Sequence, residues 1–195
     1  MKKTIYTILI ISIFINSCKD NITSPSTKIE GILPLAVGNT WVYQIVAGWT
    51  EIDTMKVVRD SLIGDERWYA IRHRLTTWDE FYTNRNDGLY LLSPYQTSPP
   101  TAYRYYKYPS SVGDSSVING GIVVKLVSNS DTVKVNGQQF ICYTYLQYVL
   151  YGSQRDTTGY LLDYMSPKVG IIKKDYYSSS NKIYNSYILL SYKLY

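Results

Sequence analysis

Side chains able to carry acid–base or nucleophilic catalysis are few in this sequence. It holds one histidine, His73, and two cysteines, Cys18 and Cys142. A Ser-His-Asp hydrolase needs a histidine base and a serine displayed on a sharp turn. His73 instead alternates with apolar Ile71 and Leu75, and no Gly-x-Ser-x-Gly segment exists. We therefore expect His73 to be a packed residue and the protein to be no enzyme.

Metal chemistry is not indicated either. Metal sites need clustered histidine, cysteine or carboxylate side chains, and the acidic residues here are dispersed. Cys142 alternates with Thr144 and Leu146, which indicates a buried, inert thiol. The sequence predicts neither a metal nor a cofactor, and the following carboxylates are interpreted as turn and strand-end residues: Asp53, Asp60, Asp65, Asp79 and Asp87.

Tyrosine is the residue type best suited to bind a ligand in this chain, which contains 22 of them. Tyrosine offers a large apolar ring and a polar tip at low entropic cost, so a tyrosine-rich surface can bind sugars, peptides or lipid. The proline-rich stretch 93–121 is the least regular, and we expect a long loop there with one strand inside. Its candidate ligand-binding residues are Tyr95, Tyr103, Tyr105 and Tyr106. The alternative is that the tyrosines only suit a half-wet sheet.

Cys18 is the residue with the most specific chemistry. Lys2 and Lys3 precede an apolar run over residues 5–15, which is too short to span a bilayer but typical of a signal peptide. The run ends in Ile-Asn-Ser before Cys18, which resembles a lipobox. We expect a signal peptide over 1–17, a lipidated Cys18 with a flexible tether over 18–33, and a single domain over 34–195.

The residues after Cys18 and the overall charge indicate the surroundings of the domain. Lys19 occupies the position where an acidic residue would retain a lipoprotein at the inner membrane. We therefore expect the protein to be anchored in the outer membrane, either on its periplasmic face or at the cell surface. Without Lys2 and Lys3, 18 basic residues face 15 acidic ones, a net charge of +3. These charges are scattered, which argues against nucleic acid as a partner.

Strands are the elements that must position these side chains. Alternating runs rich in β-branched and aromatic residues recur between turn signals, and no helical period follows the signal peptide. Asn136-Gly137 predicts a type I′ hairpin. We expect an all-β fold with a single antiparallel sheet, curved into a half-barrel or barrel-like shape, or alternatively a two-sheet sandwich. The predicted strands are 41–47, 52–62, 67–76, 79–83, 88–92, 103–108, 122–127, 131–135, 138–151, 158–164, 170–177 and 183–194.

Three segments resemble a group of uncharacterised envelope lipoproteins of the Bacteroidota type. Residues 33–43 read LPLAVGNTWVY, residues 137–143 read GQQFICY, and residues 166–173 read SPKVGIIK. The group commonly has "pLkvGNkWvY", "GtF-x-c" and "PGVGlvk" at these places. Lys168 departs from it, because glycine is common there. The resemblance implies a β-rich envelope lipoprotein and supplies no catalytic residues; we interpret the motifs as structural.

These observations together predict a non-catalytic outer-membrane lipoprotein that binds a protein or glycan partner in the envelope. We expect the protein to be anchored to the membrane by acyl chains on Cys18. Two alternatives stay open: a lipid or lipoprotein carrier whose sheet encloses an apolar concavity, and a structural envelope component.

The assignment of Cys18 can be tested directly. Replacing Cys18 by serine removes the thiol that acylation requires, so the variant should incorporate no fatty acid while the wild type does. Metabolic labelling of cells with a tagged fatty acid measures this. Label on the serine variant would contradict the assignment.

Overall fold

The computed structural model describes residues 31–93, 100–151, 154–156 and 158–195. Within these ranges the chain has no α-helix, and so none that could cross a bilayer. Its one helical segment is the 3-10 turn Asn119–Gly121 between β7 and β8. The strands are β1 (Thr40–Val46), β2 (Thr50–Ile63), β3 (Glu66–His73), β4 (Asp79–Arg85), β5 (Gly88–Leu92), β6 (Ala102–Lys107), β7 (Ser115–Ile118), β8 (Ile122–Val135), β9 (Gln138–Tyr151), β10 (Gln154–Arg155), β11 (Gly159–Ser166), β12 (Gly170–Ser178) and β13 (Ile183–Lys193).

Alternation of residue types decides which face each strand buries. In β1, Trp41, Tyr43 and Ile45 are buried while the residues between them are only half-buried. Successive side chains of a strand point to opposite faces, so these three share the inner face. Met55 and Val57 extend the same buried face on β2. The inner face of the sheet is therefore the core of the protein.

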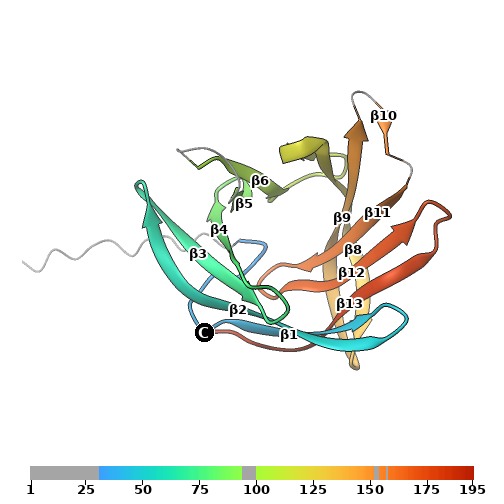
Figure 1. Ribbon diagram of the computed structural model, residues 1–195, viewed down its shortest axis with the longest axis horizontal. Coiled ribbons are helices and arrows are strands. Elements are labelled where there is room, and N and C mark those ends of the chain that lie inside the picture. Colours follow the sequence, from blue (N-terminus) through green and yellow to red (C-terminus); the bar gives the residue numbers. More distant parts are fainter. Residues whose placement is uncertain (1–30, 94–99, 152–153, 157) are drawn as a thin grey trace, which may run out of the picture.

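The strands form one antiparallel sheet in the order β6-β5-β4-β3-β2-β1-β13-β12-β11-β9-β8-β7, with the short β10 paired to β9. β1 joins the two halves because it pairs with β2 on one side and with β13 on the other. The sheet coils until its edge strands approach each other (Figure 1). Across that seam, Lys107 Nζ lies 2.8 Å from Asp114 Oδ2, just before β7. The predicted single, barrel-like sheet is confirmed, and the two-sheet sandwich is wrong.

Most predicted strands are present, and the differences are local. Asn136 and Gly137 have φ values of 49° and 78°, as the predicted type I′ turn between β8 and β9 requires. The segments predicted at 122–127 and 131–135 form one strand, β8. Register shifts on either side of Ser128 allow β8 to stay paired with β9 along its whole length. β7 was not predicted.

Residues 31–39 cross one end of the barrel. Ile32 and Leu33, assigned above to the tether, are buried in the core. Asn84 Nδ2 donates to the Leu33 carbonyl at 2.9 Å, and Asn39 Nδ2 donates to the Pro34 carbonyl at 3.0 Å. The folded unit therefore includes Ile32 and Leu33, and the predicted boundary at residue 34 falls inside it.

Two of the three lipoprotein-like segments pack against each other at this end. Trp41 Nε1 donates to the Val169 carbonyl at 2.6 Å. Gly170 has a φ of 99°, and a Cβ on it would lie 2.7 Å from Leu33 Cδ1. The β11–β12 register shifts two residues further on, where Ile172 is an extra residue opposite the Tyr164–Met165 step. Lys168 has a φ of 70°, which explains why glycine suits that position in the group. These motifs thus form a structural joint.

The close approach at Gly170 predicts a specific cost. Gly170→Ala should destabilise the fold by about 1–3 kcal/mol from backbone strain and by roughly 1–3 kcal/mol more from overpacking against Leu33. Gly113→Ala is the matched control, because Gly113 has a φ of 98° and nothing within 4 Å of an added Cβ. Urea unfolding of both variants measures the difference. Equal losses of stability would contradict the packing role of Gly170.

Candidate functional site

The inside of the barrel contains a cavity of about 290 Å³. Its floor is formed by Leu33, Leu89 and Met165, all buried. Its mouth lies at the opposite end of the barrel, where Leu75 and Thr76 of the β3–β4 connection are at least partly exposed. The cavity is therefore open at one end and closed at the other.

A buried polar cluster around one carboxylate, that of Asp163, lies beside this cavity. Asp163 of β11 is 0% exposed. Its Oδ2 accepts hydrogen bonds from the Tyr106 hydroxyl at 2.5 Å and from Gln147 Nε2. Its Oδ1 lies 3.5 Å from Lys174 Nζ on β12. The carboxylate thus connects side chains from the two strands that flank β11, β9 and β12, with one from the edge strand β6.

Lys174 brings a positive charge to the cavity wall. Burial lowers the pKa of Lys174, but attraction to Asp163 and to tyrosines including Tyr105 and Tyr176 outweighs it and raises the pKa above its ordinary value. An ammonium has three N–H donors. Its ion-pair partner, at 3.5 Å, is beyond the usual hydrogen-bond range of about 2.7–3.2 Å. Lys174 is therefore a cationic group on the cavity wall, 3.5 Å from the Asp163 carboxylate.

Asp53 and His73 bring a second polar pair to the same cavity. Asp53 Oδ2 lies 2.8 Å from His73 Nδ1, and the Asp53 side chain is 3% exposed. Burial raises the pKa of Asp53, but the hydrogen bond and charge of His73, helped by the backbone N–H groups of Thr54 and Leu75, outweigh it and lower the pKa. No group of the described residues meets hydrogen-bond geometry with the other oxygen, Oδ1. Oδ1 is itself buried, so the cavity wall contains an ionised carboxylate that is almost fully covered by His73 and the neighbouring backbone.

These positions correct one interpretation of the sequence and extend another. Asp53 is no turn or strand-end residue, because it lies on the buried face of β2. His73 does share its face with Ile71 and Leu75, as expected, but all three line the cavity. The core that packs His73 is therefore also the wall of a cavity.

Tyr103, Tyr105 and Tyr106 lie on β6, the strand expected inside the irregular stretch. Tyr106 is 1% exposed, Tyr105 is half-buried and lines the cavity with it, and Tyr103 packs against the core from β6. All three therefore belong to the core or pack against it. A register shift against Leu89 and Tyr90 makes Tyr105 an extra residue in β6. Tyr105 and the next residue, Tyr106, can therefore both reach the cavity. Their ligand-binding role stays a prediction, and Tyr95 lies outside the described residues.

Sequence reasoning missed Asp163 and Lys174. The available signal was a charged residue inside each of two strand-like runs, 159–166 and 170–178. Cys142 is buried as predicted, and burial raises the pKa of its thiol to about 12. In the part of the chain that the structure describes, no three histidine, cysteine or carboxylate side chains are grouped to hold a metal ion.

The Asp163 cluster predicts strong coupling between two side chains. Asp163→Asn leaves the Lys174 charge without its partner and should lower the free energy of unfolding by roughly 3 kcal/mol. Adding Lys174→Met should restore most of that loss. Glu51→Gln is the control, since it breaks the exposed Arg74–Glu51 pair and should cost less than about 1 kcal/mol. Additive losses in the double variant, measured by urea unfolding, would contradict the coupling.

Comparison with known proteins places the fold. No protein-family model matches the sequence, and no curated protein is similar enough to match it. An exported protein of Bacteroides fragilis with a YmcC-like fold aligns with a TM-score of 0.53 at 14% identity, covering 83% of this chain and 98% of that one. A lipoprotein of Parabacteroides distasonis aligns at 0.49 with 14% identity, covering 84% and 99%. The first alignment shows that this chain shares the YmcC-like fold.

Proposed function

We propose that this protein is a non-catalytic outer-membrane lipoprotein that binds a glycan, one sugar unit of which enters the barrel cavity. The observation that carries this proposal is that Lys174 and the Asp53–His73 pair line one small cavity together with tyrosines. A sugar hydroxyl can donate and accept hydrogen bonds, so the hydroxyls of one sugar unit suit a wall that carries both an ammonium and a carboxylate–imidazole pair.

The aromatic lining supports the same ligand class. Sugar rings have apolar C–H faces, which pack well against flat rings with a polar tip. Tyr82 and Tyr105 meet edge to face with centroids 6.4 Å apart, and Tyr105 and Tyr106 do so at 4.5 Å. The tyrosines that line the cavity are Tyr43, Tyr82, Tyr105, Tyr106, Tyr176 and Tyr187.

Size and charge weigh against the lipid carrier. Small-molecule sites are typically about 300–1,000 Å³, so a cavity of about 290 Å³ is at the small end. Acyl chains would also have to cover Asp53 and Lys174 without offering them a hydrogen bond, which is costly in an apolar environment. A compact polar ligand avoids both problems.

Binding without catalysis is the simpler use of these groups. Glycoside hydrolysis needs a carboxylic acid whose pKa is raised so that it can donate a proton. The pKa of Asp53 is lowered instead, with burial outweighed by the contribution of His73. Asp53 therefore suits a permanent hydrogen-bond acceptor, and we propose no hydrolytic step.

The envelope location rests on Cys18 and its resemblance to a lipobox. The structural neighbour from Bacteroides fragilis, described as exported, is consistent with it. So are the three motifs of the Bacteroidota-type lipoprotein group. Both the periplasmic face and the cell surface would give the mouth access to glycans.

A glycan array probed with the full-length chain in detergent tests the proposal. The wild type should bind at least one glycan, and Asp53→Asn should weaken binding about tenfold or more, since a hydrogen bond to a charged group contributes roughly 1.5–3 kcal/mol. Leu75→Trp should block the mouth without touching the charges. Val117→Trp, on the exposed face of β7, is the control and should bind normally.

Binding that survives both cavity variants would place the ligand elsewhere. An array without any bound glycan would refute the proposed ligand class. Circular dichroism of each variant shows whether it is folded. Released sugar after prolonged incubation would contradict the absence of catalysis.

A further inference from the structure

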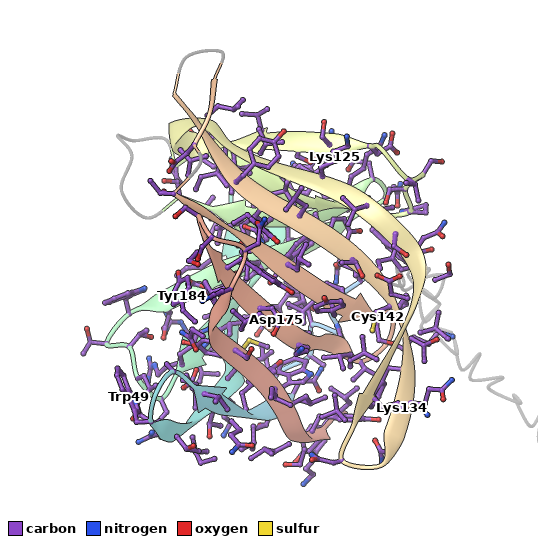
Figure 2. The ribbon with its side chains drawn as sticks, turned by 90° about the vertical axis from the view of Figure 1, so that its right-hand side faces the viewer. Trp49, Lys125, Lys134, Cys142, Asp175 and Tyr184 are labelled. Carbon is purple, nitrogen blue, oxygen red and sulfur yellow. The ribbon has the colours of Figure 1, made fainter. Side chains whose placement is uncertain are left out.

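Three exposed aromatic residues lie at the open end of the barrel, and we call them the mouth rim: Trp49, Trp78 and Tyr184. Their side chains are 67%, 52% and 60% exposed. Single exposed aromatic residues need no explanation. These three, however, come from two different connections and one strand terminus that lie at the same end of the barrel. Trp49 and Tyr184 lie toward one end of the molecule, and Cys142 and Lys134 toward the other (Figure 2).

Hydrogen bonds and one ring contact connect the rim to the cavity. Trp78 is joined to the mouth by Thr76, whose hydroxyl donates to the Trp78 carbonyl at 3.3 Å. Tyr184 lies against Tyr176, a cavity residue, with ring centroids 6.2 Å apart. The loop of Trp49 precedes β2, where Arg74 Nε donates to the Ile52 carbonyl at 2.9 Å. That hydrogen bond ties the start of β2 to the β3–β4 connection, so the connections that carry Trp49 and Trp78 are neighbours beside the mouth.

The closed floor limits how a chain could enter. Leu33 and Met165 fill the inner end of the cavity, and Leu33 also packs against Gly170. A polymer therefore cannot pass through the barrel. Because the cavity is about 290 Å³, only the end of a longer ligand fits inside. The rest of such a ligand must leave across the mouth.

We infer that the protein captures the terminal unit of a glycan chain, and that the mouth rim stacks against the units that follow it. This rests on the proposed function and adds two properties to it, end recognition and a dependence on chain length. The polar groups Asp53 and Lys174 select the terminal unit inside the cavity. The aromatic rim adds affinity for the chain outside, because its flat faces suit sugar rings of many kinds.

Competition with soluble fragments of the glycan bound on the array tests the inference. Probes are its terminal monosaccharide, its terminal tetrasaccharide, and an internal tetrasaccharide that lacks the terminal unit. For the full-length wild-type chain, the terminal tetrasaccharide should compete at least tenfold better than the monosaccharide, and the internal fragment should compete poorly. In the double variant Trp49→Ala, Trp78→Ala the tenfold advantage should vanish while the monosaccharide competes as before.

Tyr192→Ala is the matched control, because Tyr192 is an exposed aromatic residue near the Asn136 hairpin, away from the mouth. It should keep the full chain-length advantage. Equal competition by internal and terminal fragments would overturn end recognition. An unchanged advantage in the double variant would overturn the role of the rim. Both results leave binding in the cavity intact, whereas an array without any bound glycan refutes the proposed function itself.

Discussion

The buried carboxylate of Asp163 is the interaction on which the interior of this barrel depends. A buried charge is tolerated only when it is paired and hydrogen-bonded. Asp163 meets that condition with groups from three other strands, namely Tyr106, Gln147 and Lys174. β9 and β12 are the immediate neighbours of β11, but β6 is the strand at the far edge of the sheet, so the Tyr106 hydrogen bond can form only when the sheet has coiled. The same condition keeps Lys174 charged at the cavity wall.

The cavity follows from this arrangement. Aliphatic side chains close one end, where the segment around Leu33 crosses the barrel and meets Trp41 and Gly170. Toward the mouth, the inner face changes to tyrosine, Asp53 and His73, which are too polar to pack tightly as a core. The result is a blind cavity in which charged groups and tyrosines interrupt an apolar lining, and we propose that it suits one sugar unit better than acyl chains. Tyr106 both lines this cavity and donates to Asp163, so under the proposed function binding and folding share that residue.

The sequence predicted the parts of the fold that are local. Alternation located nearly every strand, and Asn136-Gly137 located the long hairpin, because both signals depend on neighbouring residues alone. The site was not predictable in the same way. Asp163 and Lys174 are ordinary charged residues until register places them inward, and the bulge at Tyr105 breaks the period of two on which the strand reading relied. Only the lipobox-like residues before Cys18 indicated a function without any knowledge of the fold.

The central claim is that the cavity holds a polar sugar unit and not lipid. Native mass spectrometry of the full-length chain, extracted gently from the envelope of its own cells, tests it most directly. The account predicts that bound mass lost on unfolding corresponds to saccharide, and that the Leu75→Trp chain lacks it. A phospholipid or fatty acid retained by the wild type and absent from that variant would contradict the account and establish the lipid carrier instead.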